Sequence, residues 1–387
     1  MSNILDYIAW RGDLSLAASP FNAVDNLILS ELIYADLKGI VPAQGATLAD
    51  AWAAYRREGR DQSHMVNDPK PLLEAAAGSR RFGGARLDCY ADELDPAREL
   101  QFAAARFLLE DGTAYIAYRG TDDTLTGWRE DFNLSFLAET PAQALAVAAL
   151  NRAAALDDRP LRVGGHSKGG NLALYAAAFC DDAARRRLIE VYSNDGPGFN
   201  RAVAEDERLS AILDRAVQII PEASLVGVLL DNRARRMVVR SSGSGVMQHD
   251  PYTWEVLGTA FVEAPRAGIS LYMDETLSQW LAALDDAQRA NLTSAVFDTL
   301  GASGATTLRE LSANRLDAAG SILKAAGAMD PELQKDVLST LRKLADAGRE
   351  VLMADLRRAF QQGLEEAREK RRADRQRGAA DPKRETV

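Results

Sequence analysis

The 387-residue sequence has few cysteines and no excess of basic residues, and each shortage excludes a class of protein. Cys89 and Cys180 are too few for a disulfide framework, and no CxxC pair suggests a zinc site. We interpret both as ordinary small core residues. Lys and Arg number 46 against 56 Asp and Glu, which gives a formal net charge of −10. This balance argues against nucleic acid as a partner.

The sequence also lacks a long apolar run. No stretch approaches the ~20 continuous apolar residues of a membrane-spanning helix, so we expect no transmembrane segment. The first residues contain no basic region followed by an apolar run, so no signal peptide is expected. Hydrophobic residues make up 47% and charged residues 26%, which excludes bulk disorder. We therefore expect a soluble, cytoplasmic protein.

Apolar patterning predicts alternating strands and helices over the middle of the chain. This alternation is typical of an α/β fold, with a mostly parallel sheet and helices on both faces. Strands are expected at 86–90, 100–109, 114–119, 161–165, 189–194, 217–220 and 237–240. Helices are expected at 24–37, 48–57, 141–157, 171–179 and 206–216.

Four regions follow from this pattern. Residues 1–85 form an N-terminal helical segment that packs on the core, and 86–270 form the α/β core. Residues 271–365 form an all-helical C-terminal cap or extension, and 366–387 form a flexible charged tail. The apolar stripe of the extension must be buried against the core, a second copy of the chain or a membrane surface. Docking on the core near the loop of His249 is favoured.

A nucleophile elbow is predicted at 165–169. This segment reads Gly-His-Ser-Lys-Gly, follows a predicted strand and opens a predicted helix, which is the context that the G-x-S-x-G motif requires. The small flanking residues let the backbone turn sharply and expose the hydroxyl of Ser167. The N-terminus of the following helix then faces the reaction centre. Ser167 is therefore the candidate nucleophile.

A serine hydroxyl needs a base, and only three histidines are present. In α/β hydrolases the chain order is serine, acid, histidine. His64 precedes Ser167 in the chain, which is the wrong order. His166 is the immediate neighbour of Ser167, and its side chain should point away from Ser167. His249 lies after the last predicted strand and is the candidate base.

The candidate acid is Asp195, which closes the strand after the elbow, where catalytic groups gather in open α/β sheets. Glu222, at the end of the next strand, is the alternative acid. Asp231 and Asp250 are also within range in the sequence.

The oxyanion hole should use the backbone N–H of Lys168, the residue after the nucleophile. The backbone and hydroxyl of Thr121, just after the strand at 114–119, are the second candidate donors. The adjacent pair Asp122 and Asp123 has no companion ligands at metal-binding spacing, so we interpret both as solvated loop carboxylates. No metal and no cofactor are expected.

Two of these segments resemble class 3 lipases. AYRGTDDTLTGWREDF is similar to their RGT…W…D segment, and GGHSKGGNLALYAA is similar to their GHSLGG elbow. The whole chain more closely resembles a bacterial family of uncharacterised lipase-like α/β hydrolases over about residues 3–345, including YSNDGPGF, IIPEASLVG and QHDPYTWEV. The resemblance implies an α/β-hydrolase core with Ser167 as nucleophile, His249 as base and Thr121 in the oxyanion hole.

The sequence departs from the lipase pattern at two positions. Class 3 lipases place their acid in a D-x-V-P segment, whereas the comparable segment here begins with Ser224. Either Asp195 or Glu222 must then act as the acid. Lys168 stands where lipases usually carry leucine; its side chain either attracts anionic substrates or lies along the helix surface.

Two functions are consistent with these features. The first is a serine hydrolase that cleaves a carboxyl ester or thioester of an acyl or lipid substrate through a Ser-His-Asp triad and an acyl-enzyme intermediate. The alternative is a catalytically idle hydrolase fold that binds partners through its C-terminal helices. A serine, an acid and a histidine in the required order favour the enzyme.

Overall fold

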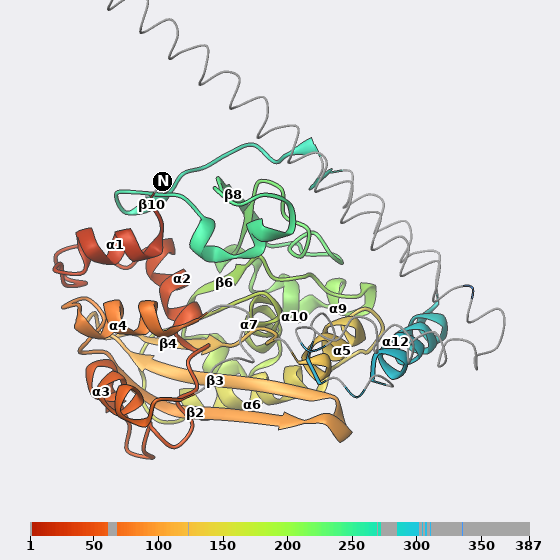
Figure 1. Ribbon diagram of the computed structural model, residues 1–387, viewed down its shortest axis with the longest axis horizontal. Helices are drawn as coiled ribbons and strands as arrows, with labels where there is room; N and C mark the ends of the chain where they lie inside the picture. Colours follow the sequence, from red (N-terminus) through yellow and green to blue (C-terminus); the bar gives the residue numbers. More distant parts are fainter. Residues whose placement is uncertain are drawn as a thin grey trace, which may run out of the picture.

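The computed structural model describes residues 2–60, 68–122, 124–268, 270–271, 285–301, 304, 306–307, 310 and 335 (Figure 1). His64, Asp123, most of the predicted C-terminal extension and the charged tail lie outside the described residues. None of the described helices is both long and apolar enough to cross a membrane.

Eight strands of the described chain form one sheet whose strand order follows the sequence. The pairings from β1 to β4 are antiparallel, and those from β4 to β8 are parallel. The predicted α/β class with a mostly parallel sheet is confirmed. The strands are β1 (Ala46–Thr47), β2 (Arg86–Asp95), β3 (Leu100–Leu108), β4 (Ala114–Tyr118), β5 (Leu161–His166), β6 (Leu188–Asn194), β7 (Ala216–Pro221) and β8 (Arg235–Val239).

One face of the sheet is covered by helices that connect its parallel strands. Right-handed crossovers between strands in sequential order place every connecting helix on the same face. Accordingly, α6 (Pro141–Ala154), α7 (Lys168–Phe179) and α10 (Glu207–Ser210) share one hydrophobic cluster with Ile116 and Tyr118 of β4. Shorter elements on these connections are α8 (Asp182–Arg185), α9 (Arg201–Ala204) and η2 (Leu213–Arg215).

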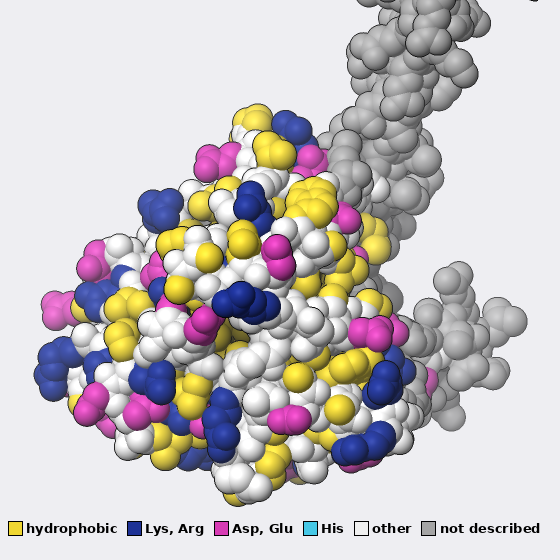
Figure 2. Space-filling model, turned by 90° about the vertical axis from the view of Figure 1, so that its left-hand side faces the viewer, with side chains coloured by type: hydrophobic (Ala, Val, Ile, Leu, Met, Phe, Trp, Pro, Cys, Tyr) yellow, Lys and Arg dark blue, Asp and Glu magenta, His cyan; other side chains and the backbone are white. Residues whose placement is uncertain are grey.

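The opposite face is covered by the N-terminal chain. Tyr115 and Ala117, which alternate along β4 with the residues of the first face, belong to the cluster of the N-terminal helices. These helices are α1 (Ile4–Arg11), α2 (Ala23–Leu32), α3 (Leu48–Glu58) and α4 (Lys70–Gly78). On the side of the molecule that carries α1, α3 and α4, basic and acidic side chains are interspersed (Figure 2).

Two sequence predictions are wrong. Asp122 is not a solvated loop carboxylate, because it is 3% exposed and its Oδ1 accepts hydrogen bonds from the N–H and the hydroxyl of Thr124. The helix expected at 206–216 is only the single turn α10 followed by η2, because β7 already begins at Ala216. The helix α12 (Asp286–Gly301) of the C-terminal extension packs on α5 (Leu125–Asn133) (Figure 1). Most of the extension lies outside the described residues, so its docking near the His249 loop stays a prediction. Phe297 of α12 meets Phe132 of α5 edge to face, with ring centroids 5.3 Å apart.

The remaining elements are short. A two-stranded hairpin pairs β9 with β10 after the last strand of the main sheet. These elements are η1 (Pro96–Arg98), η3 (Gly245–His249), η4 (Pro251–Thr253), β9 (Val256–Leu257) and β10 (Ala260–Phe261).

Candidate active site

Ser167 lies at the turn between β5 and α7 in a strained backbone conformation, with φ 59° and ψ −131°. Non-glycine residues rarely adopt positive φ, and such strain clusters at functional sites. The turn depends on its glycines because the backbone approaches closely. A Cβ at Gly169 would lie 2.1 Å from the carbonyl oxygen of Tyr118, and one at Gly165 would lie 2.4 Å from the backbone of Gly169. Local geometry is therefore that of a nucleophile elbow.

The structure brings together the three residues that chain order selects. His249 Nε2 lies 3.0 Å from Ser167 Oγ, and His249 Nδ1 lies 2.7 Å from Asp195 Oδ2. His249 comes from η3, after β8, whereas Ser167 and Asp195 follow β5 and β6. Asp195 is fully buried and the His249 side chain is 29% exposed, so the imidazole is open to a substrate from one side.

The second oxygen of Asp195 is held by neighbours. Oδ1 accepts hydrogen bonds from Ser224 Oγ at 2.5 Å and from the Gly227 N–H at 3.1 Å. Ser224 stands where the lipase-like pattern carries its acid. Its hydroxyl contacts the carboxylate of Asp195, which follows the neighbouring strand β6. Glu222 is half-buried at the end of β7, and Asp195, not Glu222, bonds to His249.

The loop after β4 contacts Ser167, the candidate nucleophile. A Cβ at Gly120 would lie 2.9 Å from Ser167 Cβ, and the Gly120 N–H donates to Tyr34 Oη at 3.1 Å. No described residue accepts a hydrogen bond from the backbone N–H of Thr121 or Lys168. These two N–H groups remain the candidate oxyanion donors.

The hydroxyl of Thr121 has a partner. Its Oγ1 donates to Asp131 Oδ2 at 2.6 Å, so this hydroxyl is not free to bind an oxyanion while Asp131 is ionised. Burial raises the pKa of Asp131 to about 7, which the nearby positive charge of Lys168 only partly offsets. The other oxygen, Oδ1, is buried and has no hydrogen-bond partner in the described chain.

Both interpretations of the Lys168 side chain are wrong. It neither faces substrate nor lies along the helix surface, because it is 1% exposed. Its Nζ donates to Glu130 Oε2 at 2.7 Å, to Gln101 Oε1 at 2.6 Å and to the Gln101 carbonyl at 2.8 Å. A buried ammonium is tolerated only when it is paired and fully hydrogen-bonded, as it is here. The side chain thus ties the first turn of α7 to α5 and β3.

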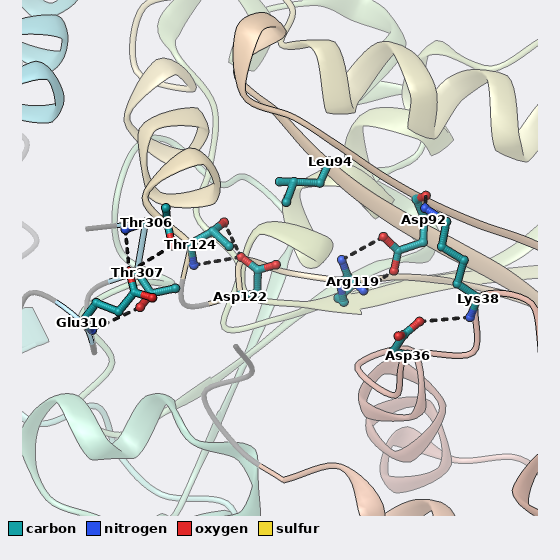
Figure 3. Close-up of a pocket in the computed structure, with 10 residues that line it drawn as sticks. All are labelled: Asp36, Lys38, Asp92, Leu94, Arg119, Asp122, Thr124, Thr306, Thr307 and Glu310. Carbon is teal, nitrogen blue, oxygen red and sulfur yellow. Dashed lines mark hydrogen bonds and ion pairs between the residues drawn. The ribbon is translucent and has the colours of Figure 1, made fainter. Parts of the chain in front are cut away.

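A pocket of about 490 Å³ adjoins this loop (Figure 3). Arg119 and Asp122, which flank Gly120 and Thr121, lie in its wall, and Arg119 points toward Asp92. Leu94 is the one hydrophobic side chain among its lining residues within the described chain. The others are charged or carry a hydroxyl: Asp36, Lys38, Asp92, Arg119, Asp122, Thr124, Thr306, Thr307 and Glu310.

Sequence reasoning missed several residues that shape this site, namely Tyr34, Gln101, Glu130 and Asp131. Asp131 is the aspartate of the RGT…W…D segment, so the motif itself pointed to it. No comparable pattern marks the others. Over the described residues, no group of three or more His, Cys, Asp or Glu side chains is placed to hold a metal ion.

Comparison with known proteins gives one family match. The Mbeg1-like family model matches residues 76–298, more than half of the chain. A crystal structure of M37 lipase is similar at 16% sequence identity and a TM-score of 0.35, covering 52% of this chain and 68% of that one. The comparison with curated proteins finds no match.

Proposed function

This chain belongs to the Mbeg1-like family, and we propose that it is a serine hydrolase that cleaves a carboxyl ester or thioester of an acyl or lipid substrate. The observation that carries the proposal is the hydrogen-bonded series from Ser167 Oγ through the His249 ring to the buried carboxylate of Asp195. The likeness of the two motif segments to class 3 lipases adds support.

Acylation begins with the hydroxyl of Ser167. Its oxygen attacks the substrate carbonyl while its proton passes to His249 Nε2, 3.0 Å away. Asp195 stabilises the imidazolium that forms and fixes the ring so that Nδ1 carries a proton. The negative charge on the tetrahedral oxygen is stabilised by the backbone N–H groups of Thr121 and Lys168.

Collapse of this intermediate breaks the ester bond. The leaving alcohol or thiol takes its proton from His249 Nε2, and the acyl group stays on Ser167. In the second half-reaction a water molecule gives a proton to His249 and attacks the acyl carbonyl. The carboxylic acid is released, and the proton returns from His249 to Ser167.

A fluorophosphonate probe tests the proposal, because it labels only an activated serine. The wild-type protein should be labelled, and Ser167→Ala should remove both the label and nearly all ester hydrolysis, a loss of several orders of magnitude in kcat. Circular dichroism should show that the variant stays folded. A folded wild-type protein that takes no label and hydrolyses no ester would instead favour the idle, partner-binding alternative.

A further inference from the structure

His166, the residue before the nucleophile, contacts the candidate base directly. Its Nε2 lies 2.9 Å from the backbone carbonyl oxygen of His249. The two imidazole rings also lie against each other, with centroids 4.6 Å apart and an angle of 33° between their planes. Because a carbonyl oxygen can only accept a hydrogen bond, Nε2 of His166 must carry a proton.

The other nitrogen of His166 faces an acid of the N-terminal helices. Nδ1 lies 3.1 Å from Glu31 Oε1, and both side chains are buried. Tyr34 Oη lies farther away, 3.4 Å from Nδ1. Burial has the largest single influence and lowers the pKa of His166. The negative charges of Glu31 and Asp195, together with the hydrogen bond to the His249 carbonyl, raise it, and the net shift is upward. Glu31 Oε1 has no hydrogen-bond partner in the described chain, so this contact is an ion pair rather than an aligned hydrogen bond. A carboxylate oxygen beside Nδ1 and a carbonyl acceptor at Nε2 together favour the doubly protonated ring.

We infer that His166 and Glu31 are positioning residues for His249: Glu31 keeps the His166 ring protonated, and His166 anchors the backbone of the base. The inference rests on the proposed function of His249. It also gives the N-terminal helical layer a part in the active site, since Glu31 belongs to α2.

Such an anchor matters because His249 lies on a short loop element rather than in the sheet. Its ring must keep Nε2 near Ser167 and Nδ1 near Asp195 at the same time. The loop has a second backbone anchor one residue earlier, where Trp254 Nε1 donates to the Gln248 carbonyl at 2.9 Å. Loss of the His166 anchor leaves the carbonyl of His249 without that donor, and the nearest backbone anchor is then the one at Gln248. Small misplacements of catalytic groups are costly.

The test compares His166→Leu, which removes the donor, with His166→Gln, whose amide N–H can reach the same carbonyl. We expect kcat and the rate of fluorophosphonate labelling to fall about ten- to hundredfold in His166→Leu, with KM nearly unchanged. His166→Gln should recover most of that loss. Tyr7→Phe is the matched control, because it removes a buried hydroxyl that bonds to Asp25 at 3.0 Å in the same helical layer, away from the site. It should lower stability and leave kcat unchanged.

A second measurement does not depend on activity. In nuclear magnetic resonance spectra, His166 should show two ring N–H signals at neutral pH, and Glu31→Gln should remove the Nδ1 signal. Persistence of both signals in Glu31→Gln would overturn the role of Glu31. Wild-type labelling of a folded His166→Leu variant would overturn the role of His166. If the wild-type protein takes no label at all, the proposed function fails, whatever the spectra show.

Discussion

The two faces of the sheet are packed in different ways. The crossover face, beneath α6 and α7, is filled by small side chains that let helices and strands approach closely, among them Ala142, Ala146, Ala153, Ala173, Ala176 and Ala177. The face beneath the N-terminal helices is filled by large side chains, among them Tyr7, Leu27, Ile28, Tyr55, Leu73 and Phe82. Close helix packing on one face and bulky side chains on the other both exclude water from the sheet.

Within the described residues, each side also encloses one ion pair whose side chains are completely buried. On the N-terminal side, Arg81 pairs with Asp25 and donates to backbone carbonyls of the loop between α1 and α2. On the crossover side, Lys168 pairs with Glu130 directly beside Ser167, the proposed nucleophile. The two ion pairs differ in the segments of the chain that they connect. The first closes the N-terminal chain on itself, and the second fixes the elbow to the oxyanion side of the site.

The largest effect on rate is expected at the sheet edge between the two faces, where the proposed triad lies. Asp195→Asn should lower kcat by about 10⁴-fold, because the imidazole loses its charge partner and its correct tautomer. Glu222→Gln, on the neighbouring strand end, is the matched control and should retain near-normal kcat. Steady-state kinetics with one ester checks both variants, and the reverse pattern would assign the acid to Glu222.

The next effect separates the two buried ion pairs. Lys168→Met and Arg81→Met each leave a buried carboxylate without its cation, which should lower the free energy of unfolding by about 3–5 kcal/mol. Of the two, only Lys168→Met should also lower kcat, by about tenfold, since it loosens the turn that carries the Lys168 N–H. Denaturant unfolding and kcat measured on the folded fraction check this. Equal losses of kcat in both variants would remove the distinction between the pairs.

The sequence predicts most of the sheet because its strands are short apolar runs bounded by turn residues. The predicted strands from 86 to 240 all correspond to β2–β8. Helix prediction is weaker where tertiary structure overrides local pattern. The helical spacing at 206–216 is interrupted because the chain must enter β7 at Ala216. The helix α5 is not predicted, because it contains Gly127 and Asn133, which are poor helix formers.

The candidate site divides in the same way. Ser167, His249 and Asp195 could be selected because chain order and strand ends are visible in one sequence. The burial of the Lys168 side chain could not be predicted, because it depends on Gln101 and Glu130, which lie far away along the chain. The pairing of His166 with Glu31 was invisible for the same reason. Long-range partners decide the electrostatics of the site.

A smaller effect is expected from the hydroxyl that supports the acid. Ser224→Ala removes the 2.5 Å hydrogen bond to Asp195 Oδ1 and leaves only the Gly227 N–H on that oxygen. The loss of one such bond should lower kcat about tenfold. Ser193→Ala is the control, because the Ser193 hydroxyl is buried without a partner in the described chain. Equal kcat in both variants would show that Ser224 does not support the acid.

The smallest effect concerns Asp131, a carboxyl on the crossover side that, unlike Asp25, has no bidentate arginine. Burial raises its pKa to about 7 in the folded protein, whereas in the unfolded chain it should titrate near ~3.9. The folded state therefore binds this proton more tightly, so the stability that it contributes is complete below about pH 4 and is lost as the pH rises to 7.

Asp131→Asn cannot ionise and should escape that loss. The Tm of the variant minus that of the wild type should therefore increase between pH 4 and pH 8, by a few degrees in all. Thermal unfolding followed by circular dichroism at several pH values measures it, with Asp158→Asn, at an exposed carboxylate, as the control. A Tm difference that stays constant across this range would mean that Asp131 keeps one protonation state, and the Thr121 hydroxyl would then have the same partner at every pH.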